Sequence, residues 1–312
     1  MKPAFLFPGQ GSQTVGMGRD LYDQYPSARL VFEEADAALG FPLSKLIFEG
    51  PDDQLKLTEH TQPAILTVSV AALRVLAEQG VRPAFAAGHS LGEFSAHVAA
   101  GTFSFADAVR TVRSRGRYMQ QAVPAGQGAM AAILSLPAER IAELCAQAAT
   151  ETGEVVSAAN LNSADQTVIS GSAAAVTRAA DLCKEAGARR AVMLPVSAPF
   201  HCALMQPAQD ALAKDLNALA FNDLAVPIAV NVDARMVTAA ADARDCLVRQ
   251  VTGTVRWIEC VQMLVAQGAT HFIEVGPGKV LSGLMRKIDP AQTAANVEDK
   301  ASLENVLKLL AA

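Results

Sequence analysis

The sequence lacks the features of membrane proteins, of disulfide-bonded or zinc-binding proteins, and of basic nucleic-acid binders. No apolar run approaches the roughly 18 residues that a membrane span needs, so no transmembrane helix is expected. The five cysteines are odd in number and form no C-x-x-C pair, so neither a disulfide framework nor a zinc site is predicted. Basic residues do not predominate either, because 26 Lys and Arg stand against 31 Asp and Glu. Nucleic-acid binders are usually basic. We therefore expect no nucleic-acid partner and no membrane partner.

We also expect no targeting signal at the amino terminus. Its apolar segment Ala4-Phe5-Leu6-Phe7 is too short for a secretory signal and is interrupted at Pro8. With 312 residues and a net charge of −5, the composition is that of an ordinary soluble chain with one large domain or two smaller ones. We expect a cytoplasmic protein that acts as a monomer.

Short apolar segments alternate with amphipathic helical segments along the chain. This alternation is typical of an α/β fold, in which helices cover both faces of a mostly parallel sheet. The segments expected to form that sheet are Ala4–Phe7, Ala84–Ala87, Ile228–Asn231 and His271–Val275.

The pattern of predicted elements changes in the middle of the chain, where it predicts the order β-α-β-β-α-β. That order is the ferredoxin-like split unit. We interpret residues 126–196 as a small domain inserted into a larger α/β domain that comprises residues 1–125 and 197–312. The predicted elements are strand Ala129–Leu134, helix Pro137–Ala149, strand Val155–Ala159, a turn at Asn160–Asp165, strand Thr167–Ser170, helix Ser172–Ala186 and strand Ala191–Leu194.

The pentapeptide Gly88-His89-Ser90-Leu91-Gly92 has the G-x-S-x-G pattern of a nucleophile elbow. It follows the predicted strand Ala84–Ala87 and precedes a helical segment, Glu93–Ala100, which ends at Gly101. In such a strand-to-helix turn the small flanking residues let the serine hydroxyl project above the sheet. Ser90 is therefore the predicted nucleophile, and a glycine-rich turn with a solvated serine is the alternative.

A serine hydroxyl needs a base at neutral pH, and imidazole is the usual one. His89 is a poor candidate because adjacent side chains diverge on a tight turn, and His97 on the following helix is better explained as packed or solvated. His60 falls in a polar segment and His271 opens a predicted strand. His201 falls in a proline-punctuated loop at the domain boundary, where sites between domains are built. His201 is therefore the candidate base, with a merely solvated loop histidine as the alternative.

Arg115 stands apart from the other arginines of the predicted helix Phe105–Gln121. On a helical wheel it falls about 60° from the centre of the apolar face, whereas the others fall about 100° to 160° away on the opposite side. An arginine on an apolar face needs an anionic partner. That partner is either a structural Asp or Glu, or the carboxylate of a substrate, which a guanidinium can bind in a bidentate manner.

The glycine-rich segment Phe7–Gln13 follows the first predicted strand, so it lies at the same sheet edge as the elbow. It lacks the Lys-Ser/Thr ending of a phosphate-binding loop and has no G-x-G-x-x-G pattern, so a nucleotide site is not expected. A close backbone approach to the reaction centre explains the glycines better. Backbone N–H groups of Gln10 and Leu91 are the predicted donors of an oxyanion hole.

Taken together, the motifs of this chain resemble those of the malonyl-CoA:acyl-carrier-protein transacylases of fatty-acid synthesis. The resemblance extends over nearly the whole sequence and depends on the order and spacing of several independent segments. These are Phe7–Gln13, Gly88–Glu93, Arg115-Gly116, Asn160–Ser163, Ser197–His201, Val230–Asp233, Val248–Gln250 and Glu274–Leu281.

The resemblance implies an α/β-hydrolase-like large domain interrupted by a ferredoxin-like one. It also implies that Ser90 is the nucleophile and His201 the base, and that the backbone carbonyl of Gln250, rather than an Asp, orients the imidazole. A Ser-His dyad of this kind explains why no third triad residue is evident in the sequence.

The same resemblance assigns Arg115 to the substrate carboxylate, and Gln10 with Leu91 to the oxyanion hole. Phe200 departs from many stand-alone members, which carry a small residue before the histidine. In the related polyketide-synthase acyltransferases, Phe at that position accompanies malonyl selection, and Leu91 points the same way.

The expected reaction is a ping-pong transfer of the malonyl group from malonyl-CoA to the phosphopantetheine thiol of acyl carrier protein, without metal or redox cofactor. Two alternatives remain: a serine thioesterase or hydrolase that admits water, and a non-catalytic subunit that binds a carrier protein. Carrier proteins of this pathway are acidic, so a basic surface is also expected, with Arg113, Arg117, Arg189 and Arg190 as candidates.

Overall fold

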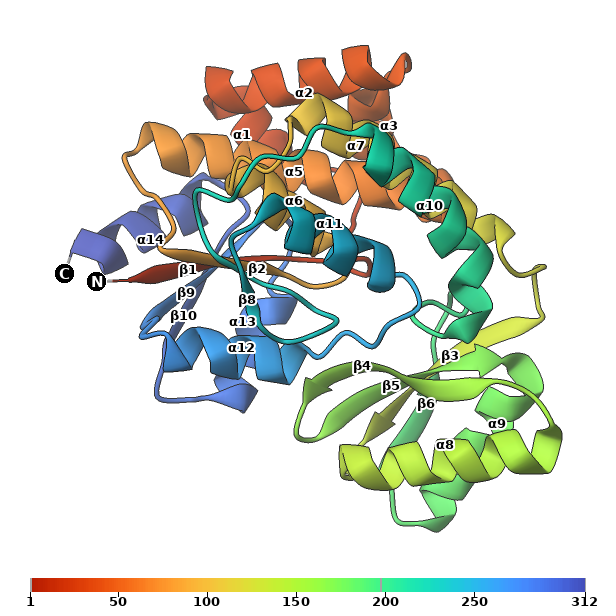
Figure 1. Ribbon diagram of the computed structural model, residues 1–312. Helices are drawn as coiled ribbons and strands as arrows, with labels where there is room; N and C mark the ends of the chain where they lie inside the picture. Colours follow the sequence, from red (N-terminus) through yellow and green to blue (C-terminus); the bar gives the residue numbers. More distant parts are fainter. Residues whose placement is uncertain (1, 197, 312) are drawn as a thin grey trace.

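The computed structural model describes residues 2–196 and 198–311, so the predicted domain boundary at Ser197 lies outside the described residues. Figure 1 shows two units, each built around its own sheet, with the second unit projecting from one end of the first. Among the described residues, no helix combines the length and apolar character needed to cross a membrane.

The larger unit contains a six-stranded sheet with the order β10-β9-β1-β2-β7-β8. All neighbouring strands are parallel except β7 and β8, which are antiparallel. The strands are β1 (Pro3–Phe7), β2 (Phe85–Gly88), β7 (Ile228–Ala229), β8 (Met236–Val237), β9 (His271–Val275) and β10 (Thr293–Val297).

Strand β1 shows why this sheet is covered on both faces. Successive side chains of a strand point to opposite faces. Phe5 and Phe7 join one apolar core, Ala4 and Leu6 join another, and all four are fully buried. A strand that is apolar at every position therefore requires helices on both sides.

The two helical layers differ in size. Helices α12 and α13 supply the smaller core, and most of the remaining helices lie on the other face (Figure 1). The helices of this unit are α1 (Arg19–Gln24), α2 (Pro26–Leu39), α3 (Leu43–Glu49), α4 (Asp52–Leu55), α5 (Thr58–Glu78), α6 (Gly92–Ala99), α7 (Phe105–Gln121), η1 (Ala203–Met205), α10 (Gln206–Ala218), α11 (Ala240–Arg249), α12 (Trp257–Ala266), α13 (Val280–Ile288) and α14 (Lys300–Ala311).

The second unit has an antiparallel four-stranded sheet with the order β4-β5-β3-β6. Its elements follow the predicted sequence of strands and helices. They are β3 (Gly128–Leu134), α8 (Ala138–Thr152), β4 (Val156–Ser163), β5 (Gln166–Ser172), α9 (Ala173–Glu185) and β6 (Arg190–Met193).

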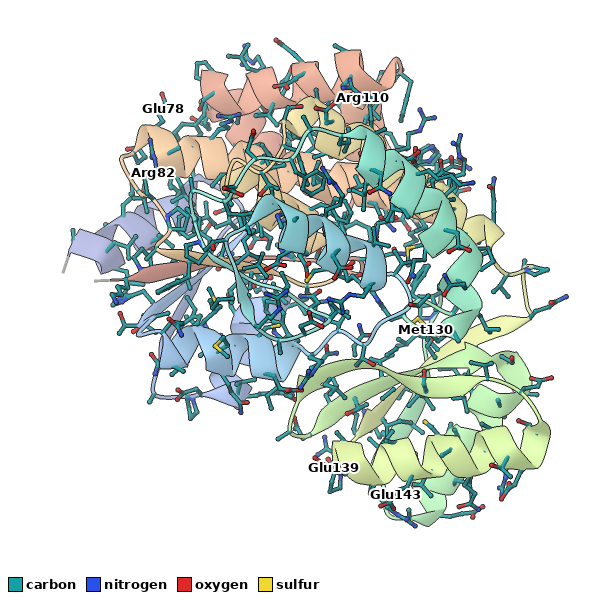
Figure 2. All side chains as sticks on the ribbon, in the orientation of Figure 1. Glu78, Arg82, Arg110, Met130, Glu139 and Glu143 are labelled. Atoms are coloured by element: carbon teal, nitrogen blue, oxygen red, sulfur yellow. The ribbon has the colours of Figure 1, made fainter. Side chains whose placement is uncertain are left out.

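Alternate residues of β3 face different surroundings. Ala131 and Ile133 pack under α8 and α9, whereas Met130 and Ala132 belong to the core of the larger unit. Figure 2 shows Met130 at the junction of the two units, while Glu139 and Glu143 lie on the outer side of α8. The second sheet is thus covered by its own helices on one face and by the larger unit on the other.

Backbone hydrogen bonds also join the two units. The N–H of Val255 donates to Ala159 O at 2.8 Å, and the N–H of Leu161 donates to Val255 O at 2.9 Å, which forms a short parallel bridge beside β4. Thr254 Oγ1 adds a bond to Ala158 O at 2.8 Å.

Several predicted boundaries differ from those of the structure, and two of these errors fall at asparagines. The turn predicted at Asn160–Asp165 is mostly strand, because β4 continues to Ser163 with bulges and only residues 164 and 165 turn. The strand predicted at Ile228–Asn231 ends at Ala229, where the chain leaves the sheet toward a turn with Ala234 at φ 50°. In both places asparagine side chains have polar partners, which the hydrophobic pattern does not register.

Candidate active site

The loop between β2 and α6 holds Ser90 in a strained backbone conformation, with φ 51° in the left-handed region that L-residues avoid. The glycines around it are required by close contacts. A Cβ at Gly88 would lie 1.9 Å from the carbonyl carbon of Gly92, and a Cβ at Gly92 would lie 2.0 Å from Phe7 O. The sequence motif therefore has the geometry predicted for a nucleophile elbow.

His201 lies against the elbow serine. Its Nε2 is 2.7 Å from Ser90 Oγ, and its Nδ1 is 2.9 Å from the backbone oxygen of Gln250 and 3.2 Å from that of Gly253. A carbonyl oxygen only accepts hydrogen bonds, so Nδ1 carries the proton and Nε2 of the neutral ring accepts from the serine hydroxyl. Ser90, His201 and the Gln250 carbonyl, which were predicted to act together, are thus in contact.

The protonation state of His201 follows from its surroundings. Burial, together with the positive charge of Arg115, lowers the pKa of this imidazole to about 3. The ring is therefore neutral at physiological pH, which is the state in which it can take a proton from the Ser90 hydroxyl.

Arg115 lies on the buried face of α7, as the helical wheel predicted, and is only 1% exposed. Its Nη2 donates to Ser90 Oγ at 3.2 Å, so the guanidinium reaches the same oxygen atom as His201. Burial lowers its pKa to about 10, which leaves it charged at neutral pH. Within the described part of the chain no carboxylate lies within ion-pair distance of it. The alternative of a direct structural salt bridge is therefore wrong.

The first loop and the elbow approach each other closely, as predicted. The N–H of His89 donates to Phe7 O at 3.0 Å, and a Cβ at Gly9 would lie 2.4 Å from His89 O. The backbone N–H groups of Gln10 and Leu91 make no hydrogen bond to any other described residue. Both donors are therefore available to a ligand beside Ser90.

Asn231 holds the elbow and was not identified as a site residue from the sequence. Its Oδ1 accepts from the N–H of Ser90 at 2.7 Å, and its Nδ2 donates to Gly88 O at 2.7 Å. One amide thus spans the strained turn. The available signal was an asparagine directly after an apolar strand, within the segment Val230–Asp233.

A buried carboxyl group, Glu93, completes the support of the elbow. Its Oε2 accepts from the N–H of Asn231 at 2.8 Å and from Nε2 of Gln250 at 3.1 Å. Burial is the main cause that raises the pKa of Glu93 to about 7, and these hydrogen bonds oppose it.

Two other histidines have structural partners. His89 Nε2 lies 2.8 Å from Asn162 Oδ1 of β4, and burial lowers its pKa. His97 is fully buried, with Nδ1 3.0 Å from Thr102 Oγ1. Neither contacts Ser90 in the hydrogen bonds of the described residues, and among those residues no group of three or more His, Cys, Asp or Glu could hold a metal ion.

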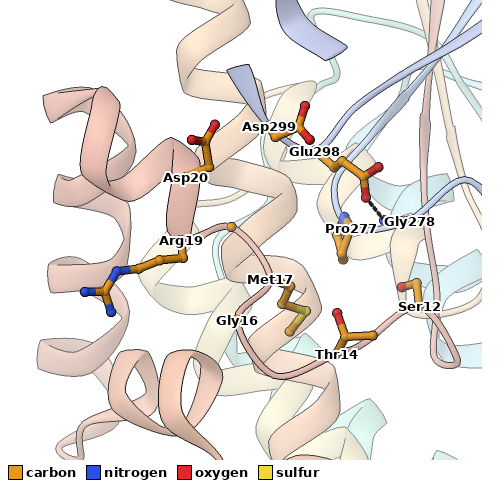
Figure 3. A pocket seen from close by; sticks show the side chains of 11 residues that line it. Ser12, Thr14, Gly16, Met17, Arg19, Asp20, Pro277, Gly278, Glu298 and Asp299 are labelled. Carbon is orange, nitrogen blue, oxygen red and sulfur yellow. Dashed lines mark hydrogen bonds between the residues drawn. The ribbon is translucent and has the colours of Figure 1, made fainter. Parts of the chain in front are cut away.

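A separate cavity of about 360 Å³ lies behind the first loop, between Ser12 and Glu298 (Figure 3). Its carboxylates already have partners: Glu298 accepts from the N–H of Gly278 at 3.0 Å, and Asp20 accepts from the N–H of Lys300 at 2.7 Å. None of the predicted site residues lines it.

Comparison with known proteins agrees with this arrangement. Residues 4–307 match the family described as the acyl transferase domain. This chain belongs to the acyl transferase family. It is 50% identical over 309 residues to the malonyl CoA-acyl carrier protein transacylase of Bacillus subtilis, with 99% of this chain and 97% of that protein covered. It is 51% identical to the enzyme of the same name from Escherichia coli, with 98% and 99% covered.

Solved structures of acyl transferase family members have the same fold. The acyl carrier protein S-malonyltransferase of Vibrio cholerae superposes with a TM-score of 0.95 at 51% identity, covering 98% of this chain and 100% of that one. A malonyl-transacylase solved in complex with a type II PKS acyl-carrier protein gives 0.96 at 46% identity, covering 99% and 100%.

Proposed function

We propose that this protein transfers the malonyl group from malonyl-CoA to acyl carrier protein in fatty-acid synthesis, through a malonyl-serine intermediate. The observation that carries the proposal is the convergence of His201 and Arg115 on Ser90 Oγ, at 2.7 Å and 3.2 Å. The names of the relatives, about half identical over nearly the full chain, support it.

In the first half-reaction Ser90 Oγ attacks the thioester carbonyl while His201 Nε2 takes the hydroxyl proton. The resulting oxyanion accepts hydrogen bonds from the N–H groups of Gln10 and Leu91, which have no other partner among the described residues. The carbon–sulfur bond then breaks, and the coenzyme A thiolate takes the proton from the imidazolium.

In the second half-reaction the phosphopantetheine thiol of the carrier protein gives its proton to His201 and attacks the serine ester. The tetrahedral intermediate collapses with cleavage of the bond to Ser90 Oγ, which recovers the proton. The Gln250 and Gly253 carbonyls keep the imidazole oriented through both steps, because they accept from Nδ1–H at 2.9 Å and 3.2 Å. The carbonyls carry out the orienting role that an Asp has in a triad.

Arg115 binds the free carboxylate of the malonyl group in this proposal. A buried guanidinium without a carboxylate partner favours an acyl chain that supplies one. This distinguishes the proposed transferase from a thioesterase for neutral acyl groups. The presence of both Ser90 and His201 argues against a non-catalytic carrier-binding subunit.

We further propose the finer description of the fold: an α/β-hydrolase-like domain of residues 1–125 and 197–312, and a ferredoxin-like domain of residues 126–196. The reaction consists of two acyl transfers, so it requires no metal or redox cofactor. Malonyl-CoA and acyl carrier protein are the partners, and we propose that the enzyme acts as a cytoplasmic monomer.

The deciding experiment is intact-protein mass measurement after exposure to malonyl-CoA, followed by addition of holo acyl carrier protein. A malonyl adduct that persists in water, moves to the carrier thiol and is absent from Ser90→Ala supports the proposal. Rapid release of free malonate would indicate a hydrolase instead. No adduct on the wild-type protein would indicate a non-catalytic subunit.

A further inference from the structure

Arg115 has an unusual set of partners for a buried cation, because all of them are uncharged. Its Nη1 donates to Gln62 Oε1 at 2.8 Å, and its Nη2 donates to Gln250 Oε1 at 3.0 Å and to Ser90 Oγ at 3.2 Å. Buried arginines are normally paired with carboxylates. The guanidinium is therefore oriented on two sides by amide oxygens without being neutralised by contact.

A carboxylate is nevertheless nearby, and the side chain of Gln250 separates it from the guanidinium. Gln250 Nε2 donates to Glu93 Oε2 at 3.1 Å, while its Oε1 accepts from Arg115. Arginine can only donate, and the Glu93 oxygen accepts here, so this orientation of the amide provides a hydrogen-bond partner for both side chains. Glu93 is further engaged by the N–H of Asn231.

Gln62 is held in place by the packing of α5 against α7. It is 2% exposed, and its Nε2 faces Met119 Sδ at 3.8 Å, which directs Oε1 toward Arg115. The helices approach closely because Gly116 has no side chain: a Cβ there would lie 2.5 Å from Thr58 O. The amide oxygen of Gln62 is thus a fixed acceptor at the buried end of the guanidinium.

We propose that Gln62 is a specificity-determining residue that, with the side chain of Gln250, orients Arg115 while preserving its charge for acyl groups that end in a carboxylate. This inference rests on the proposed function. A guanidinium has five N–H donors, and the three hydrogen bonds above leave Nε–H and one Nη1–H over. Nε is buried without a partner among the described residues. The hydrogen bonds between described residues use neither of these two donors.

The chemistry of position 62 gives the inference a sharp test. A glutamate there would have nearly the same shape as glutamine and would accept from Arg115 at least as well. It would also neutralise the guanidinium and repel the carboxylate of the substrate. If Gln62 only orients Arg115, glutamate at position 62 should keep the preference for malonyl-CoA. If Gln62 also preserves the positive charge of Arg115, glutamate should reduce that preference more than any other replacement.

The variants are Gln62→Glu, Gln62→Leu, which removes the acceptor but leaves the charge, and Gln79→Glu as a matched control at the exposed end of α5. For each variant, kcat/KM is measured with malonyl-CoA and with acetyl-CoA. Both values are divided by the rate at which an uncharged organophosphonate modifies Ser90, because that rate measures how many active sites are correctly assembled. We expect the malonyl:acetyl ratio to fall at least a hundredfold in Gln62→Glu and about tenfold in Gln62→Leu, with no change in Gln79→Glu. A ratio within threefold of wild type in Gln62→Glu, or a larger loss in Gln62→Leu, overturns the inference.

A binding measurement separates this inference from the proposed function. In a Ser90→Ala background, the dissociation constants of malonyl-CoA and acetyl-CoA are compared with and without Gln62→Glu. Loss of the preference for malonyl-CoA upon that change supports the role of Gln62 even if no transfer to a carrier protein is found. An unchanged preference refutes it even if transfer is found.

Discussion

Ser90 Oγ is shared by two side chains with opposite electrostatic requirements. His201 must be neutral to accept a proton, and burial together with the charge of Arg115 keeps its pKa near 3. Arg115 must be charged to bind a carboxylate, and with a pKa of about 10 it remains so. Both states coexist at neutral pH because the lowered pKa of His201 lies well below 7, whereas the lowered pKa of Arg115 still lies well above 7.

Arg115→Ala should separate the two substrates. Losing a buried charge-assisted contact with the malonyl carboxylate should lower kcat/KM for malonyl-CoA by about a hundredfold or more. Acetyl-CoA leaves the wild-type guanidinium unpaired, so its transfer should improve relative to malonyl. The measurement is the malonyl:acetyl ratio in the two folded proteins. Arg110→Ala is the matched control, because Arg110 lies on the exposed side of the same helix and pairs with Asp107. An unchanged ratio in Arg115→Ala would return the residue to a structural role.

The site residues that were predicted from the sequence are identified by their neighbours in the sequence, whereas those that were missed depend mainly on contacts with residues far away in the sequence. Ser90 and Arg115 are marked by their immediate neighbours, through a glycine-flanked turn and a helical period. The only local signal of Asn231 is its place after an apolar strand, and Gln62 has none; the partners that give them their roles lie 141 and 53 positions away. No local pattern contains that information, so these residues emerge only once the chain is folded.

At the scale of elements, the contact between α5 and α7 determines where Arg115 and Gln62 meet. Gly116→Ala places a methyl group 2.5 Å from Thr58 O and 2.8 Å from Glu59 Cα, both of them backbone atoms that cannot rotate away. We expect a loss of about 1–3 kcal/mol in the free energy of unfolding and a lower malonyl:acetyl ratio.

Gly283→Ala in α13 is the matched control for Gly116→Ala, because nothing lies within 4 Å of its added Cβ. There the better helix propensity of alanine should leave stability unchanged or raise it by up to about 1 kcal/mol. Urea unfolding of both variants gives the comparison. Equal stability of the two variants would show that the helix contact tolerates a side chain.

Elements with a clear apolar pattern were predicted well, and those that serve polar functions were not. Helix α7 has the predicted bounds, and β9 does as well. Strand β10 was missed because Thr293–Val297 is half polar and only partly buried, and β4 was cut short because its asparagines resemble a turn. The hydrophobic period identifies segments that are buried in the core. It does not identify β10 and the end of β4, because these strands border polar surroundings.

At the scale of the whole molecule, buried histidines should make stability depend on pH. Burial lowers the pKa of His97 to about 3, against an ordinary value of 6.5 in the unfolded chain. Between these values only the unfolded state binds the proton, so stability falls as pH falls from about 6.5. His201 contributes in the same direction, whereas Glu93, whose pKa is raised to about 7, opposes them by binding its proton in the folded state.

His97→Asn isolates one of these protons, because asparagine can keep a bond to Thr102 and does not titrate. We expect the slope of unfolding free energy against pH, measured by urea unfolding between about pH 5 and 6, to become less steep by about 1.4 kcal/mol per pH unit. An identical slope in the variant would mean that His97 is protonated in the folded protein as readily as in the unfolded one.

The basic residues proposed to attract a carrier protein lie on two different elements. Arg113 and Arg117 belong to α7, where Arg113 packs on the Phe41 ring at 4.6 Å, while Arg189 and Arg190 are exposed at the start of β6. Transfer to an acidic carrier should slow as ionic strength rises from about 50 to 500 mM, because added salt screens such attraction. Transfer rates that do not change with salt would refute electrostatic steering.

The backbone bridge between Val255 and β4 limits how the second unit could be exchanged between related proteins. The same short segment supplies the carbonyls of Gln250 and Gly253 that hold His201, and then pairs with Ala159 and Leu161. The inserted unit is therefore not an interchangeable module joined only at its two chain crossings. A chimaera that exchanges residues 126–196 between relatives would have to carry residues 250–255 with them, because otherwise the new insert would disturb the acceptors that aim the imidazole.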